Sequence, residues 1–285
     1  EIWYTPINGT QPMREAAQLK FKRDHGLDYG LDQITAGAGT KQILFNALMA
    51  TVSQGDEVII PAPYWASYPD MVLLCGGTPV PVSCGQNNQF KMRPEQLEEA
   101  ITDKTKWLMF CAPGNPTGAT YTPKEMKALA DVLLRHPHVH ILSDDVYEHL
   151  IFDGNEFSTF AQIEPKLYDR TVTCNGVSKA YSMTGWRLGW MVVPRDLSGS
   201  MERLAQNFFI SPPTLSQFAG LAAFDCEEEL QANVARYARN REVLLNELPA
   251  AGLGDLAPAD GAFYIYADVS RYTNDSAAFS KRMLN

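Results

Sequence analysis

Strand-like and helix-like segments alternate along most of this chain, and this order constrains the fold more than any other feature of the sequence. Such alternation is typical of a mainly parallel sheet covered by helices. Several strand-like segments are continuous apolar runs, as expected where a parallel strand is buried on both sides. We therefore predict a three-layer α/β/α domain with a mainly parallel mixed sheet, whose strands cover residues 33–36, 57–61, 79–82, 106–111, 140–143, 171–175 and 188–193.

The segments between and after these strands show apolar residues at the helical period. Residues 41–52 and 123–134 each predict a helix. The second begins with Thr122 as the N-cap and Glu125 at the third helical position, which is the capping-box pattern. A longer helix is predicted over residues 228–248, where the alternation with strands ends.

The chain changes character after this long helix. Turn-forming residues follow around Gly252 and over residues 258–261, and residues 262–268 predict a further strand. The remainder is too short for an independent domain. We therefore predict a large domain over residues 1–247 and the beginning of a small α+β domain over residues 248–285.

The composition excludes several classes of protein. Hydrophobic residues make up 45% and charged residues 20% of the 285 residues, a mixture typical of a globular chain. The net charge of −9 argues against binding to nucleic acid or anionic lipid. The longest apolar runs, such as residues 107–112, fall short of the roughly 18 residues that a membrane span needs. Five widely spaced cysteines with no CxxC pair predict buried thiols in a reducing cytoplasm.

Four polar clusters follow directly after predicted strands. They are GAGTKQ over residues 37–42, APGNPTG over 112–118, DDVY over 144–147 and GVSKAYSMTGWR over 176–187. In open α/β sheets, ligands bind beyond the carboxyl ends of the strands. The four clusters are therefore expected to share one crevice.

The first cluster favours a phosphate. Its two glycines and its hydroxyl precede a predicted helix, whose N-terminal N–H groups attract anions. It matches neither the P-loop pattern nor G-x-G-x-x-G, because Gln42 stands where the last glycine is required. A simple strand-to-helix turn is an equal alternative for this cluster taken alone.

The other clusters contain residues that could act chemically. Asp144 follows an apolar run, where a carboxylate needs a cation such as a protonated heterocycle, or else serves as an N-cap or ion-pair partner. Lys179 becomes a nucleophile for carbonyl compounds if it is desolvated, although most lysines are solvated surface residues. Arg187 has the geometry to bind a phosphate with two hydrogen bonds. Asn115 and Tyr147 are also compatible with a polar turn and a packed aromatic residue.

Taken together, these clusters resemble a known family. The motifs are PGNPTG with Asn115, D-x-x-Y with Asp144 and Tyr147, and SKAYSMTGWRLG with Lys179 and Arg187. In order and spacing they resemble the class I pyridoxal-phosphate-dependent aminotransferases of fold type I, typified by the bacterial aspartate aminotransferases. The resemblance extends from YTPINGT near the start to GAFYIYADVS near the end.

The resemblance implies that pyridoxal 5'-phosphate (PLP) is the cofactor. Lys179 resembles the lysine that binds it covalently and later moves the proton at the substrate Cα. Asp144 resembles the residue that keeps the pyridine nitrogen protonated. Asn115 and Tyr147 resemble the hydrogen-bond donors to the ring hydroxyl. Lys179, Asp144 and Tyr147 are therefore the catalytic candidates.

Other positions resemble the remaining contacts of this cofactor. Trp65 in APYWASY resembles the aromatic residue that stacks on one face of the ring, and Val146 resembles the small residue on the other face. Tyr4 resembles the tyrosine that reaches the phosphate of a neighbouring subunit, which implies a homodimer. The phosphate contacts within the chain are represented by the backbone of Gly39 and the side chains of Thr40, Ser178 and Arg187.

The chain departs from the family pattern in three places. Gly176 stands where some relatives have a serine, which puts one phosphate contact in doubt. The C-terminal arginine that pairs with the substrate α-carboxylate does not occur before Asn285, and Arg271 and Arg282 do not lie in the expected context. The family's N-terminal arm does not precede Glu1, so the sequence corresponds to the large domain and the beginning of the small one.

The implied function is transfer of an amino group between an L-amino acid, aspartate-like or aromatic, and a 2-oxo acid. A lyase of the same fold is one alternative, and it would release ammonia or thiol from a single amino acid. A non-catalytic cofactor-sensing domain of a transcription regulator is another. It would need a basic DNA-binding segment, which this acidic chain lacks.

Two further patterns receive simple interpretations. In HPHVH over residues 136–140, His138 and His140 share one face if the segment is a strand, but no carboxylate or cysteine lies at ligand spacing nearby. No metal site is therefore predicted. Trp186 and Trp190 are predicted to belong to the hydrophobic core.

Overall fold

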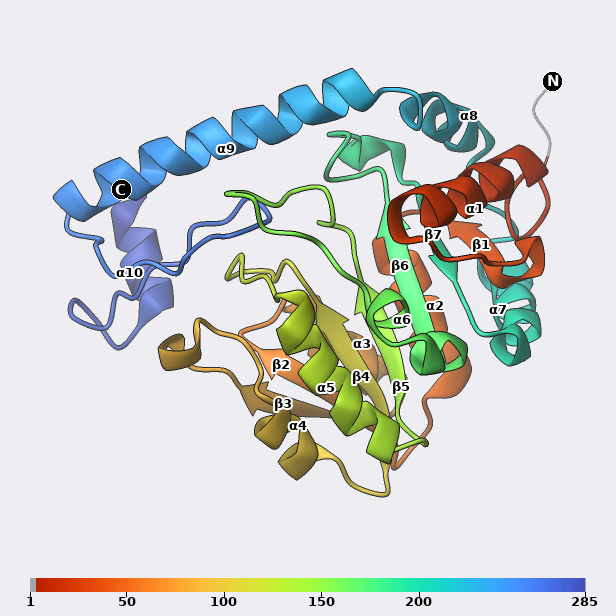
Figure 1. The fold of residues 1–285 in the computed structure, drawn as a ribbon, viewed down its shortest axis with the longest axis horizontal. Coiled ribbons are helices and arrows are strands. Elements are labelled where there is room, and N and C mark those ends of the chain that lie inside the picture. Colours follow the sequence, from red (N-terminus) through yellow and green to blue (C-terminus); the bar gives the residue numbers. More distant parts are fainter. Residues whose placement is uncertain (1–3, 285) are drawn as a thin grey trace.

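Seven strands form one mixed sheet in the computed structural model, which describes residues 4–284 (Figure 1). Their order across the sheet is β1, β7, β6, β5, β4, β2, β3. β7 is antiparallel to both of its neighbours, and the other neighbouring pairs are parallel. The strands are β1 (Ile34–Gly37), β2 (Glu57–Ala62), β3 (Thr78–Ser83), β4 (Thr105–Cys111), β5 (His140–Asp144), β6 (Thr171–Gly176) and β7 (Gly189–Val192).

These seven strands correspond to the seven predicted between residues 33 and 193. The helices before, between and after them are α1 (Gln11–His25), α2 (Thr40–Thr51), α3 (Ser67–Leu74), α4 (Pro94–Ala100), α5 (Pro123–Arg135), α6 (Phe160–Ile163), α7 (Arg195–Phe208), α8 (Thr214–Ala223), α9 (Glu227–Ala250) and α10 (Ser276–Met283). The predicted capping box begins α5: the Glu125 amide donates to Thr122 Oγ1 (3.2 Å), and the Thr122 amide donates to Glu125 Oε2 (2.8 Å).

Helices pack against both faces of the sheet because successive residues of a strand point to opposite sides. In β4, Trp107 and Met109 join the core cluster that includes α2 and α3. Leu108 and Phe110 join the cluster that includes α4 and α5. A third cluster joins α1 to β1 and β7. The predicted three-layer α/β/α architecture is confirmed.

Residues 262–268 do not form the predicted strand. Two isolated β-bridges form here, one between the adjoining Gly261 and Ile151 and one between Ala267 and Leu256. Ala262 has a φ of +58°, which turns the chain out of the extended conformation. Phe263 of this segment instead stacks on Tyr237 of α9, the long helix that runs along one side of the molecule in Figure 1.

Two predictions about burial are partly wrong. Trp190 is buried as predicted, but Trp186 is 48% exposed because it lies in a surface turn just before Arg187. Cys84 and Cys174 are buried, whereas the other three cysteines are half-buried. Among residues 4–284, no helix has the length and apolar character that crossing a membrane requires.

Candidate functional site

A cavity of about 230 Å³ lies at the carboxyl ends of the parallel strands. β1, β4, β5 and β6 run in one direction, because the antiparallel β7 separates β1 from β6. Their carboxyl ends therefore share one edge of the sheet, where ligands bind in folds of this class. Residues from all four predicted polar clusters line the cavity.

One wall of the cavity has the chemistry of an anion site. α2 begins at Thr40 with Gly39 as its N-cap. Gly39 has a φ of +88°, and a Cβ there would lie 2.5 Å from Nη2 of Arg187, so glycine is required. Thr40, Ser178 and Arg187 line this part of the cavity. Hydroxyls, a guanidinium and the N-terminus of a helix together favour a phosphate.

Gly176 shows why the serine of some relatives is missing here. A Cβ at Gly176 would lie 2.7 Å from Thr40 Oγ1 and 2.8 Å from the Leu188 carbonyl oxygen. The Thr40 hydroxyl also donates to the carbonyl of Asn175 (3.2 Å). Thr40 therefore occupies the space that a side chain at position 176 would need.

Asp144, at the end of β5, is the buried carboxylate of the site. The Tyr68 hydroxyl donates to its Oδ2 (2.7 Å), while Oδ1 is buried without a hydrogen-bond partner among the described residues. Burial raises the pKa of Asp144 to about 6, and the bond from Tyr68, the backbone of Val146 and the charge of Lys179 oppose that increase. One oxygen is thus held by the protein, and the other is available to a ligand in the cavity.

Three polar groups meet on another side of the cavity. The hydroxyls of Tyr147 and Tyr264 lie 2.6 Å apart, and Asn115 Nδ2 donates to the Tyr264 hydroxyl (3.0 Å). Burial and the contact with Tyr264 raise the pKa of Tyr147, so its hydroxyl stays protonated. These groups can donate to an oxygen on a bound ligand.

Lys179 is the half-buried amine of the cavity. Burial lowers the pKa of Lys179, and Arg187 lowers it further, while the Asp144 carboxylate opposes the change. Its Nζ lies 5.4 Å from the ring centre of Phe263 and 6.0 Å from that of Tyr147. An amine in such surroundings loses its proton more readily than a surface lysine and can attack a carbonyl carbon.

Trp65 and Val146 also line the cavity, as predicted for residues that contact a ring. Tyr4, which is predicted to reach the site of a neighbouring subunit, is 77% exposed and does not line the cavity of its own chain. The remaining sequence-derived candidates lie together, in the lining or, for Gly39, directly against Arg187.

The cavity also contains residues that the sequence reasoning missed. They are Lys41, Leu44, Tyr68, Thr184 and Tyr264. Lys41 and Thr184 lie inside two of the polar clusters, next to residues that were singled out. Tyr68 follows Trp65 by three residues at the start of α3, so helical spacing was an available signal. The sequence contains no comparable signal for Tyr264, because residues 262–268 predict a strand.

Comparison with known proteins gives consistent matches. The family model described as "Aminotransferase class I and II" matches residues 3–285. An aspartate/prephenate aminotransferase of Cereibacter sphaeroides is 52% identical over 268 residues, which is 94% of this chain and 67% of that protein. The chain thus spans about two thirds of the length of such relatives.

Solved structures agree with this match. The crystal structure of the aspartate aminotransferase from Rhizobium meliloti superposes with a TM-score of 0.89 at 44% identity, covering 93% of this chain and 66% of that one. The Thermus thermophilus aspartate aminotransferase with maleate gives a TM-score of 0.92 at 37% identity, covering 99% and 73%. This chain therefore belongs to the class I and II aminotransferases.

Proposed function

We propose that this chain binds PLP in the cavity and transfers an amino group between an L-amino acid and a 2-oxo acid. The observation that carries the proposal is the pair formed by Lys179 and Asp144 in one cavity: a half-buried amine, and a buried carboxylate with one oxygen that has no hydrogen-bond partner within residues 4–284. PLP requires both groups, an amine for its aldehyde and an anion for its protonated ring nitrogen.

The other residues of the cavity fit this cofactor. The N-terminus of α2 with Thr40, Ser178 and Arg187 would hold the phosphate. Trp65 and Val146 would enclose the ring from its two faces. When bound, PLP supplies an electron sink for the charge that develops when the substrate Cα loses its proton.

Residues of this chain would then control the transfer of the proton from the substrate Cα. Lys179, with its lowered pKa, would take the proton from the substrate Cα and pass it to the cofactor carbon. Asp144 stays anionic and keeps a positive charge on the ring nitrogen, and Tyr68 holds the carboxylate in place. Tyr147 and Asn115 provide hydrogen bonds to the ring oxygen, directly or through the Tyr264 hydroxyl.

The function is tested by supplying the full-length protein with PLP, aspartate and 2-oxoglutarate. Formation of glutamate and oxaloacetate in equal amounts, dependent on both substrates, is the expected result. Release of ammonia from aspartate without an acceptor would identify a lyase. Cofactor binding without turnover of any amino acid would favour the sensing domain of a regulator.

We propose that the preferred substrate carries a second acidic group. The named substrates of the Cereibacter sphaeroides relative, aspartate and prephenate, share this property, and the Thermus thermophilus structure contains maleate, a dicarboxylate. Lys41 lines the cavity beside Trp65, with its Nζ 4.4 Å from the ring centre. Its ammonium donates to the Ser67 hydroxyl (3.2 Å), forms no ion pair with the residues that the structure describes, and is suited to a second carboxylate.

Replacing Lys41 with methionine is expected to raise KM for aspartate by about tenfold, because a hydrogen bond to a charged group is lost. Alanine as the amino donor serves as the control, since it has no second carboxylate. Steady-state kinetics with both donors measures the difference. An equal change for the two donors would contradict the proposed role of Lys41.

We further propose a homodimer in the cytoplasm, in which Tyr4 completes the partner's phosphate site. Tyr4 is exposed, and the large apolar residues Phe208, Leu215 and Phe218 of α7 and α8 are also exposed. Such apolar surface is typical of an interface. Sedimentation at micromolar concentration is expected to show a dimer. A monomer that binds PLP with full affinity would contradict both the dimer and the role of Tyr4.

A further inference from the structure

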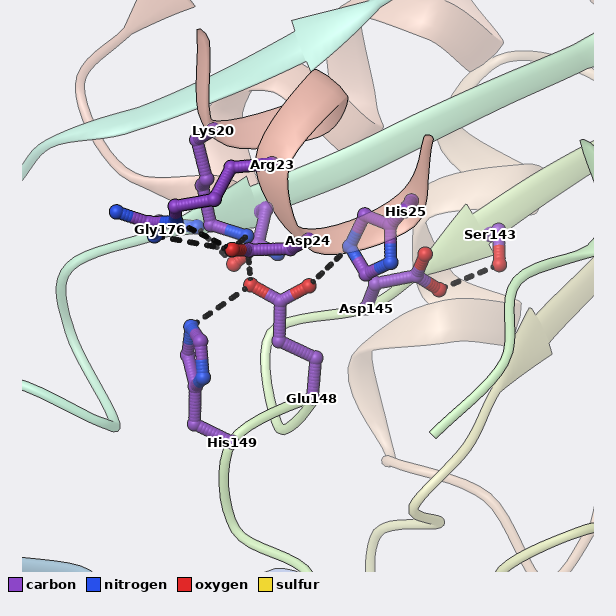
Figure 2. Close-up of polar contacts among 10 residues, drawn as sticks. Lys20, Arg23, Asp24, His25, Ser143, Asp145, Glu148, His149 and Gly176 are labelled. Carbon is purple, nitrogen blue, oxygen red and sulfur yellow. Dashed lines mark hydrogen bonds and ion pairs between the residues drawn. The ribbon is translucent and has the colours of Figure 1, made fainter. Parts of the chain in front are cut away.

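A cluster of charged side chains lies between α1 and the turn over residues 146–149 (Figure 2), with three members buried and two half-buried. It consists of Lys20, Asp24 and His25 of α1, and of Glu148 and His149 of the turn over residues 146–149. We call it the α1–turn cluster. It lies outside the cavity, since none of its members contributes to the lining.

Glu148 is the centre of the α1–turn cluster. Its Oε1 contacts the Lys20 ammonium and lies 3.1 Å from His149 Nε2, and its Oε2 lies 2.8 Å from His25 Nε2. The side chain of Lys20 is 1% exposed and that of Glu148 is 3% exposed. Burial alone would raise the pKa of Glu148, but these neighbours outweigh burial and hold it well below its usual range. Glu148 is therefore an anion paired through both of its oxygens, although Oε1 makes ion-pair contacts without a hydrogen bond among the described residues.

The turn directs neighbouring side chains to opposite sides. Asp144 and Tyr147 line the cavity. Glu148, the residue after Tyr147, enters the α1–turn cluster, as Figure 2 shows. The backbone of the turn has few bonds of its own: the amides of Asp145, Glu148 and Leu150 donate to carbonyls at 2.9, 3.0 and 2.8 Å. Glu148 is thus the side chain that attaches this short turn to a helix.

α1 does not reach the cavity. None of its residues, all of which lie in the described part of the chain, lines it. The helix is itself anchored, since its apolar residues join the core cluster with β1 and β7. Glu148 makes direct ion-pair contacts between the turn and α1, with Lys20 and His25.

A metal ion does not explain the α1–turn cluster. Asp24, Glu148 and His149 bring ligand atoms within 4.8 Å of one another. However, the Lys20 ammonium contacts both carboxylates, at 3.0 Å for Asp24. A cation already occupies the position that a metal would take.

We propose that Glu148, held by Lys20 and His25, is a positioning residue that fixes the turn carrying Tyr147 and, through it, the geometry of the cofactor site. This inference rests on the proposed function, because that function identifies PLP as the ligand of the site. A buried ion pair contributes little net stability compared with packed apolar residues, but it restricts how the groups are oriented. The position of the turn sets the orientation in which the Tyr147 hydroxyl meets the Tyr264 hydroxyl.

The test compares Glu148→Gln, the double variant Lys20→Met/Glu148→Gln, and Asp24→Asn as the matched control. The double variant removes both charges, so no unpaired charge is left buried. Asp24 contacts Lys20 in the same cluster but makes no hydrogen bond to the turn among those seen in the structure. Hydrogen exchange of the peptide over residues 144–150 is measured in the cofactor-free proteins, and PLP affinity and the pH titration of the bound cofactor's absorption are measured in the loaded ones.

Exchange in residues 144–150 is expected to be about tenfold faster or more in both Glu148 variants, with protection elsewhere unchanged, because a buried partner of the turn is lost. PLP affinity is expected to fall about tenfold, and the midpoint of the absorption titration to shift. Asp24→Asn is expected to behave like the wild-type protein in all three measurements.

Three outcomes would overturn the inference: folded Glu148 variants that match Asp24→Asn, faster exchange spread over the whole protein, or a double variant that does not fold. The last two would show a role in general stability rather than in positioning. Absence of PLP binding in the wild-type protein would instead refute the proposed function, and the exchange comparison without cofactor would still decide the role of Glu148.

Discussion

Replacement of Lys179 by alanine is expected to lower the rate of transamination by a factor of about 10⁴ or more, because one residue supplies both the covalent attachment and the proton transfer. The structure supports this expectation, since Lys179 is the half-buried amine beside Asp144, with a lowered pKa. PLP is expected to bind the variant more weakly and without a covalent bond.

Borohydride reduction followed by peptide mapping measures the covalent bond directly. In the wild-type protein the label is expected on Lys179. Lys41 provides an internal control, because it is the other lysine that lines the cavity. A label on Lys41, or a Lys179→Ala variant that retains turnover, would contradict the assignment.

Replacement of Asp144 by asparagine is expected to lower kcat by about 10²–10³, the usual loss when one group that stabilises developing charge is removed. An amide at this position cannot hold a positive charge on the ring nitrogen. Binding of PLP is expected to persist, since the phosphate contacts and Lys179 are unchanged.

Asp145→Asn is the matched control for this variant. Asp145 is equally buried and adjacent in sequence, and its Oδ1 likewise accepts one bond, from the Ser143 hydroxyl (2.6 Å), but it does not line the cavity. Single-turnover conversion of the bound cofactor by aspartate separates chemistry from binding. Equal reaction rates for Asp144→Asn and Asp145→Asn would mean that the carboxylate need not line the cavity. The role assigned to Asp144 would then be wrong.

The fold could be predicted because the apolar patterns of the strands and of the helices indicate the same α/β architecture. In β4, a continuous apolar run indicated a strand buried on both faces, and alternate residues of that run do join different core clusters. Parallel strands place their carboxyl ends at one edge, so four polar clusters from distant parts of the sequence could be expected in one crevice.

The contacts within the site were less predictable. Tyr68 comes from α3 and Asp144 from β5, 76 residues apart, and no local pattern indicates that the hydroxyl of one meets the carboxylate of the other. Tyr264 reaches Tyr147 because residues 262–268 turn instead of extending. The division at residues 247 and 248 and the roles of the site residues stay predictions.

What the sequence determined by itself is the order of strands and helices and the set of residue types at the strand ends, because both follow from local periodicity and composition. Only the tertiary structure decided which oxygen of Asp144 is free and which is held, and that Glu148 of the same turn is bound to α1 rather than exposed. Those outcomes depend on packing between segments distant in the sequence, where a displacement of a few tenths of an ångström makes or breaks a hydrogen bond.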